Sequence, residues 1–159
     1  MRIALGTDHR GVETARGLVP YLEAKGHEVV VLGECSGSSC DYPDSAFLVG
    51  RAVSSGQFDR GILVCGSGIG MSIAANKVDG VRAALVQDEL TAELSRSHND
   101  ANVLCLSGDL IGQTLAKRIV DVWTTTPFEG GRHGRRVTKI AAIEKGVDPA
   151  KVTNGPSAS

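Results

Sequence analysis

Residues 61–72 read GILVCGSGIGMS, and the fold of the chain follows from this stretch. Ile62 to Cys65 are apolar and follow a turn-prone Asp-Arg-Gly segment, which is typical of a buried strand. Gly66, Gly68 and Gly70 come next, and an apolar helical pattern begins at Met71. A strand, a glycine turn and a helix start in this order expose backbone N–H groups beside the positive end of a helix dipole. The stretch therefore predicts a seat for a phosphate or a developing oxyanion.

On both sides of this stretch, apolar strand patterns alternate with helical patterns. Strands are predicted at 2–6, 28–32, 62–65, 81–86 and 102–106, and helices near 10–25, 44–56, 69–77, 88–97, 109–123 and 133–145. Strands that alternate with helices five times predict an α/β fold with a doubly wound, five-stranded parallel sheet. We expect three α/β/α layers and an extra C-terminal helix. One domain is expected over residues 1–146, followed by a flexible tail at 147–159.

Three local features refine this prediction. Pro20 lies inside the first helical pattern, so we expect a kink or an early break there. Asp44-Ser45 can cap the helix that ends near Gly56. The segment GECSGSSCDYPD before that cap is rich in Gly and Ser, and we expect no regular structure in it.

Composition limits the classes of function. The 159 residues fit one domain, and a 42% hydrophobic fraction supports a core. Lys+Arg 17 against Asp+Glu 18 gives no field that would attract nucleic acid or an anionic membrane, and no apolar run approaches a membrane span. The start, MRIALGTDHRG, lacks the apolar segment of a signal peptide, so we expect a cytoplasmic protein. We therefore expect the four cysteines to be free thiols.

The parallel sheet predicts where a ligand binds. In such sheets the ligand lies beyond the carboxyl ends of the strands, near the point where strand order reverses. That edge gathers Asp8-His9, Cys65 with its glycines, Gln87-Asp88 and the Ser107–Asp109 turn.

Cys65 ends its strand directly before the glycines, where backbone N–H groups would favour a thiolate. Buried cysteine is also a common small hydrophobe, which is our interpretation of Cys105. The G-x-G-x-G spacing at 66–70 departs from the G-x-G-x-x-G dinucleotide fingerprint, lies on the third strand and has no Walker lysine. A nicotinamide site is therefore disfavoured, and a tight turn without a ligand stays open. Cys35 and Cys40 have no second pair with which to bind zinc.

The basic side chains later in the chain can each be interpreted either as functional groups or as ordinary surface residues. His98 follows a helix and precedes Asn99-Asp100, so it is either a functional group or a surface histidine at a helix C-terminus. Arg132, Arg135 and Arg136 lie at the start of the last helix, where cations are disfavoured. They indicate an anionic partner or a solvated basic turn.

These segments together resemble the type B ribose-5-phosphate isomerases, the family that includes the subunits of galactose-6-phosphate isomerase. The matching segments are GTDHRG at 6–11, DYPD at 41–44, GILVCGSGIGMSIAANK at 61–77, SHNDANVL at 97–104 and FEGGRHGRRV at 128–137. The resemblance implies a Rossmann-like cytoplasmic dimer or tetramer that needs no metal or other cofactor. It also implies interconversion of ribose 5-phosphate and ribulose 5-phosphate through a cis-enediolate.

The resemblance further implies roles for individual residues. Cys65 would be the base that moves a proton between C2 and C1, and a free cysteine needs its thiolate stabilised to serve at neutral pH. Met71 stands where a second branch of the family has a glutamate, so this chain depends on the cysteine. His98 would open the furanose ring from the partner subunit, and Ser67 would assist the O–H transfer. The remaining implied contacts are Asn99 and the amides of Gly66, Gly68, Ile69 and Gly70 to the enediolate, Asp8 and Tyr42 to the sugar, and His9, Arg132 and Arg136 to the phosphate.

One position departs from the family pattern. Many members have an arginine after the fifth strand, where this chain has Asp109. A carboxylate near a phosphate dianion costs on the order of 1 kcal/mol or more. An isomerase of a hexose 6-phosphate or of an unphosphorylated aldose is therefore an alternative.

Two further classes remain as alternatives. A catalytically idle sugar-phosphate binder, or a subunit that lends only its interface, would need neither Cys65 nor His98. A thiol redox protein would need a second cysteine beside Cys65, and Gly66–Ser67–Gly68 supplies none.

Overall fold

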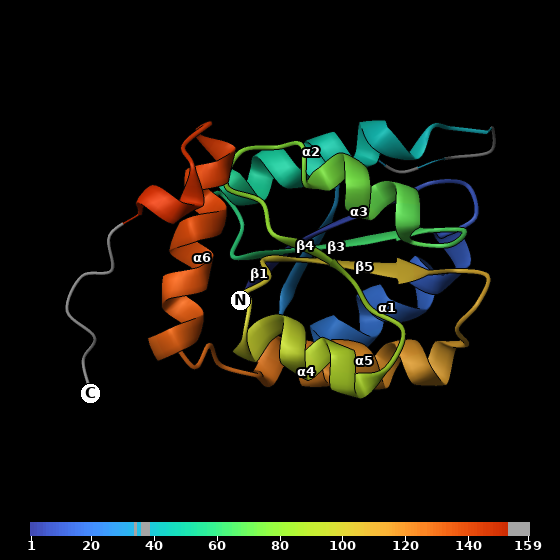
Figure 1. Ribbon diagram of the computed structural model, residues 1–159. Coiled ribbons are helices and arrows are strands. Elements are labelled where there is room, and N and C mark those ends of the chain that lie inside the picture. Colours follow the sequence, from blue (N-terminus) through green and yellow to red (C-terminus); the bar gives the residue numbers. More distant parts are fainter. Residues whose placement is uncertain (34, 36–38, 153–159) are drawn as a thin grey trace.

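A computed structural model describes residues 1–33, 35 and 39–152. Its centre is a five-stranded sheet with the order β2-β1-β3-β5-β4, and every pairing in it is parallel (Figure 1). The chain winds outward from β1 to β2 and then in the opposite direction through β3, so strand order reverses between β1 and β3. The predicted doubly wound α/β sheet is confirmed.

The elements follow one another in the predicted alternation. They are β1 (Arg2–Thr7), α1 (Val12–Ala24), β2 (Glu28–Val31), α2 (Tyr42–Ser54), β3 (Arg60–Cys65), α3 (Ile69–Ala75), β4 (Ala83–Leu85), α4 (Glu89–Ser97), β5 (Val103–Ser107), α5 (Gln113–Thr125), α6 (Gly131–Glu144) and the 3-10 turn η1 (Pro149–Lys151). None of the helices in the part of the chain that the structure describes has the length and apolar character to span a bilayer.

Side chains alternate between the two faces of the sheet, as strand geometry requires. One face packs against α1, α4 and α5, and the other packs against α2 and α3 (Figure 1). The first face presents Ile3, Leu5, Ile62, Val64, Leu104 and Leu106, and the second presents Ala4, Leu63, Cys65, Val103 and Cys105. The sheet is therefore the middle layer of three, with one core on each side.

The sheet has two ends of different character. At the carboxyl end, Thr7 pairs in register with Val64, and Cys65 with Ser107, so the loops after β1, β3 and β5 emerge side by side. Helix α6 lies at the amino end, on the side opposite to the direction in which the β5 arrow points (Figure 1). The predicted ligand edge is thus built by three loops, and α6 lies away from it.

Three helix boundaries differ from the prediction. The early break at Pro20 is wrong: α1 runs on to Ala24, and Pro20 is exposed, so water can solvate the carbonyl group that its missing N–H leaves without a partner. The predicted cap at Asp44-Ser45 is wrong: α2 already begins at Tyr42, with Asp41 in the N-cap position and Pro43 in the first turn. The Ser45 hydroxyl lies within hydrogen-bond distance of the Thr7 and Gly33 carbonyl oxygens, at 2.7 and 2.8 Å, so it does not cap the helix.

Helix α5 starts at Gln113 instead of 109. Residues 108–110 form a turn in which the Ser107 hydroxyl accepts the Leu110 N–H at 2.9 Å, and Gly112 takes the N-cap position.

The expectation that all four cysteines are free is wrong for two of them. Cys35 and Cys40 are paired as a disulfide, with Cα atoms 6.1 Å apart. Cys65 and Cys105 are free and buried. The expected irregular loop includes residues 34 and 36–38, which lie outside the described residues, and so do residues 153–159 of the expected tail.

Candidate active site

Cys65 ends β3 with its sulfur at the boundary between the core and the loops. Its side chain is only 4% exposed and belongs to the core between the sheet, α2 and α3. The Sγ atom accepts the backbone N–H of Gly68 at 3.2 Å. The sulfur thus contacts apolar side chains on one side and a backbone N–H donor on the other. An N–H donor is the kind of group that stabilises a thiolate.

The glycine cradle, residues 66–70, has a shape that requires glycine at its centre. Gly68 has a φ of 76°, in the left-handed region. A Cβ atom there would lie 2.6 Å from Leu85 Cδ1 and 3.0 Å from the Leu106 carbonyl carbon. The turn therefore packs against β5 and aims the Gly68 amide at the cysteine. Ser67 is half-buried, and its Oγ accepts the Ile69 N–H at 3.3 Å.

Tyr42 reaches the cradle from the start of α2. A Cβ atom on Gly70 would lie 2.5 Å from Tyr42 Cζ, so the phenol ring lies directly against this glycine. The side chain remains 40% exposed. The structure thus brings Tyr42, a predicted sugar contact, to the same place as the cysteine and the cradle.

The loop after β1 is held rigidly against β3. The N–H of Asp8 donates to the Val64 carbonyl at 3.2 Å. Its buried carboxylate accepts the Arg10 and Gly11 N–H groups through Oδ1, at 2.8 and 3.0 Å. Asp8 therefore shapes its own loop with one oxygen. His9, between these residues, is exposed at the same edge.

The loop after β5 completes this edge. Ser107 donates its hydroxyl to the Gly66 carbonyl at 2.5 Å, and the Asp109 N–H donates to the same carbonyl at 3.1 Å. The Asp109 carboxylate is not an isolated charge, since it pairs with Arg10 at 2.7 Å. Sequence reasoning missed this partner, because the two residues are 99 positions apart.

The other predicted site residues lie at the opposite end of the sheet. His98 is the C-cap residue of α4, with exposed Asn99 beside it, directly before β5 begins. Arg132 and Arg136 are exposed on the first turns of α6. β3 has six residues, about 20 Å at about 3.3 Å per residue. One chain therefore does not bring these four residues to Cys65.

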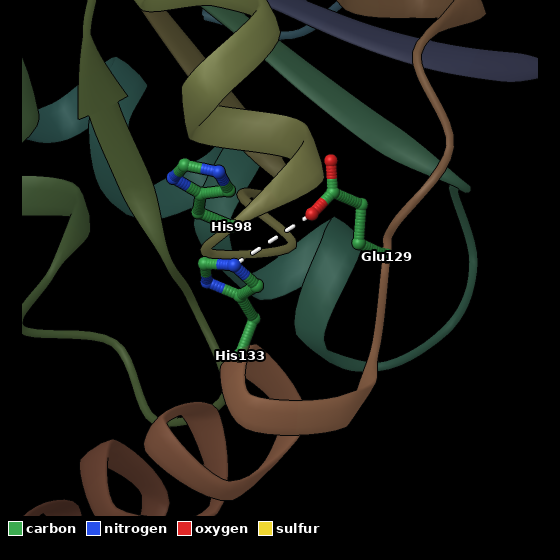
Figure 2. Close-up of side chains that lie close together, drawn as sticks. All are labelled: His98, Glu129 and His133. Atoms are coloured by element: carbon green, nitrogen blue, oxygen red, sulfur yellow. Dashed lines mark ion pairs between the residues drawn. The ribbon is translucent and has the colours of Figure 1, made fainter. Parts of the chain in front are cut away.

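A histidine cluster joins α4 to α6 at this distant end (Figure 2). The rings of His98 and His133 are stacked, with centroids 4.0 Å apart and planes 6° from parallel. Glu129 points an oxygen at His133 from the segment before α6, with 3.6 Å between Oε2 and Nε2. Sequence reasoning missed His133 and Glu129, and no spacing rule would have paired them with His98.

Among the described residues, this cluster is the one group whose donor atoms could approach a metal, since they lie within 4.8 Å of one another. The arrangement does not fit an ion. Nitrogen lone pairs lie in the ring planes, and those of parallel rings do not converge on one point. The His133 Nε2 atom also accepts the Arg132 Nε–H at 3.1 Å. The cluster is therefore a packing contact in which the His98 ring lies flat on the buried His133 ring.

Burial of His133 has a consequence for stability against pH. Burial, and then the neighbouring charges of His98, Arg132 and Arg136, lower the pKa of His133, while Glu129 opposes them. Burial also lowers the pKa of His27. Because the unfolded chain binds these protons near pH 6.5, it gains protons that the folded chain does not. Full stability is expected above about pH 6.5, with a progressive loss as pH falls below it.

We therefore expect the melting temperature to fall on acidification from about pH 7.5 to about pH 5.5, the range around the histidine pKa. In the double variant His27→Gln/His133→Gln, the fall should be clearly shallower. Circular dichroism melts across this range measure it. An equally steep fall in the double variant would show that other groups cause the acid sensitivity.

The fold and this edge define a class: parallel α/β proteins with a thiol and a glycine cradle at the carboxyl ends of the strands. The family model for ribose/galactose isomerases matches residues 3–140, and the chain belongs to this family. It is 46% identical over 144 residues to ribose-5-phosphate isomerase B of Escherichia coli, covering 91% of this chain and 97% of that protein.

Solved structures agree with this assignment. The ribose-5-phosphate isomerase B of Clostridium thermocellum superimposes with a TM-score of 0.90 at 48% identity, covering 92% of this chain and 99% of that one. The Mycoplasma genitalium ribose-5-phosphate isomerase B with bound ribulose-5-phosphate gives a TM-score of 0.87 at 45% identity, covering 91% and 96%. The family suggested by the sequence motifs is confirmed.

Proposed function

We propose that this protein interconverts ribose 5-phosphate and ribulose 5-phosphate by proton transfer through a cis-enediolate. The observation that carries the proposal is the Cys65 sulfur, placed at the topological switch point against the Gly68 amide. The family membership and the ribulose-5-phosphate complex of the Mycoplasma genitalium relative support it.

The proposed chemistry needs a base at carbon and donors at oxygen. The Cys65 thiolate takes the proton from C2 of the open-chain aldose, and the electron pair moves into the C1 carbonyl to give the enediolate. Amides of the cradle stabilise the negative oxygens, because donors fixed in place cost no reorganisation during the reaction. The Ser67 hydroxyl passes a proton between O2 and O1, and the Cys65 thiol then protonates C1. Asp8 and Tyr42 contact the sugar, and Asn99 of a second copy assists at the enediolate.

We propose that two copies of the chain form each site in a homodimer or a larger homo-oligomer. His98, Arg132 and Arg136 lie about a strand length from Cys65, about 20 Å, and an extended pentose phosphate is shorter than that. A twofold interface can place the amino end of one sheet against the carboxyl end of the other. Because each contact then occurs twice, the dimer has two complete sites, each with Cys65 from one chain and His98 and the arginines from the other. His98 then opens the furanose ring. The two arginines bind the phosphate from across the interface, and His9 binds it from the chain that carries Cys65.

The ion pair of Asp109 bears on the choice of substrate. Paired with Arg10, the carboxylate no longer adds a full negative charge to the edge. The reason for favouring an unphosphorylated aldose is thereby removed, and no observation in the structure favours a hexose 6-phosphate. Because a charged phosphate ester does not cross membranes, the proposal also places the enzyme in the cytoplasm, where such esters are made.

The test is a comparison of kcat/KM for ribose 5-phosphate, ribose, allose 6-phosphate and galactose 6-phosphate. We expect the highest value for ribose 5-phosphate. Binding of all four sugars without any turnover would show an idle binder, and a higher value for a hexose 6-phosphate would reassign the substrate.

A further inference from the structure

An ion pair with no role in the proposed chemistry lies at the edge of the cradle. Asp109 Oδ2 accepts Arg10 Nε and also contacts Arg10 Nη2, each at 2.7 Å. The side chains come from the loops after β1 and β5 and are 56% and 36% exposed. The pair is thus open to solvent on one side, at the edge where the substrate enters.

The pair touches the first residue of the cradle. A Cβ atom on Gly66 would lie 2.8 Å from Asp109 Oδ2 and 2.9 Å from Arg10 Nε. Only a glycine therefore lets these two side chains lie over the peptide that follows Cys65.

The backbone that carries Arg10 is fixed on both sides. Its own N–H is bound by Asp8, and a Cβ atom on Gly108 would lie 2.6 Å from its carbonyl oxygen. Because backbone and side chain are both held, Arg10 loses less conformational freedom on binding a ligand than an ordinary surface arginine.

The guanidinium group has donors left over. Asp109 takes the Nε edge, and Arg10 Nη1 makes no hydrogen bond to any of the described residues. A guanidinium has five N–H donors in a planar fork, so it can bind a carboxylate on one edge and phosphate oxygens on another.

We propose that Arg10 is a specificity-determining residue that binds the phosphate group of the sugar, and that Asp109 is the positioning residue that orients its guanidinium. This inference rests on the proposed function. It gives the phosphate a cation from the chain that carries Cys65, next to His9 and facing the two arginines of the second copy. The negative residue that breaks the family pattern thereby becomes part of a phosphate-binding pair.

The test is steady-state kinetics of Arg10→Ala with two substrates. For ribose 5-phosphate, KM should rise by about 10- to 100-fold, the loss expected for a charge-assisted hydrogen bond, with kcat nearly unchanged. For ribose, which has no phosphate, kcat/KM should stay within about threefold of the wild-type value, a smaller change than the loss of one charge-assisted hydrogen bond would cause. Inorganic phosphate as a competitive inhibitor should lose affinity in parallel. Arg16→Ala is the matched control, because Arg16 is exposed on α1, pairs with Glu13 and should leave all these values unchanged.

The double variant Arg10→Ala/Asp109→Ala separates binding from simple neutralisation. If Arg10 binds the phosphate, KM stays high after the carboxylate is removed. Recovery of the wild-type KM would show that Arg10 only cancels the charge of Asp109, and would overturn the inference. Asp109→Ala alone should raise KM by a smaller factor without lowering kcat, and a fall in KM would overturn the positioning role.

Failure of the inference and failure of the proposed function look different. A wild-type protein that turns over ribose 5-phosphate, together with an unaltered KM in Arg10→Ala, rejects the inference alone. Absence of turnover in the wild type rejects the function.

Discussion

Replacement of Cys65 by alanine is expected to lower kcat for ribose 5-phosphate by about 10²- to 10⁴-fold, the range for loss of a general base. The residues around the sulfur offer no substitute. Met71, behind it in the core, cannot accept a proton, and Ser67 has a hydroxyl that is far too weak a base at neutral pH. Proton NMR in D₂O measures the effect as loss of exchange at C2.

The fold should survive this change. The side chain is small and makes one polar contact, to the Gly68 N–H, so the lost hydrogen bond and the small cavity together put about 2 kcal/mol of stability at stake. Circular dichroism and the melting temperature of Cys65→Ala provide the check.

Cys105→Ala is the matched control. Cys105 is fully buried on the neighbouring strand, faces the same core, and burial raises the pKa of its thiol. Removing its sulfur should cost about 1 kcal/mol of stability through a small cavity and leave turnover close to wild type. Full activity in Cys65→Ala, or its loss in a folded Cys105→Ala, would contradict the assignment.

The sequence was informative where local pattern and topology rules act together. Five apolar segments alternating with helices specify a parallel sheet, and the rule on carboxyl ends then places Asp8, Cys65 and Asp109 along one edge. The structure has these residues on neighbouring loops. Helix ends were less predictable, because they depend on which group satisfies the first N–H donors. Ser45 bonds the carbonyls of β1 and Gly33, and Ser107 holds a turn that delays α5.

Contacts between distant segments could not be predicted from one sequence. Arg10 and Asp109 form an ion pair although they are 99 positions apart, and the sequence around either residue gives no sign of the other. The same holds for the stack of His98 on His133, which depends on how α4 meets α6. The Cys35–Cys40 disulfide shows another limit. The expectation of free thiols came from the lack of a signal peptide, and it does not indicate which two cysteines the fold brings close together.

The second large effect concerns the residues at the amino end of the sheet. In the double variant Arg132→Ala/Arg136→Ala, kcat/KM for ribose 5-phosphate should fall by about 100-fold or more, because two charge-assisted contacts to the phosphate are lost. Both side chains are exposed in the single chain, and the one hydrogen bond lost is that of Arg132 to His133, so the melting temperature should change little. A loss of less than about threefold, below the value of one hydrogen bond, would show that they are a solvated basic turn.

The central claim is that Cys65 of one subunit and the arginines of another act on the same sugar. The most direct measurement mixes Cys65→Ala subunits with Arg132→Ala/Arg136→Ala subunits, each nearly inactive alone, and assays ribose 5-phosphate turnover at substrate below KM. Random exchange makes half of the dimers mixed, and each mixed dimer has one intact site of two, so about a quarter of wild-type activity should return. If exchange is verified by co-purification of a tagged subunit and the mixture stays inactive, the shared site is contradicted.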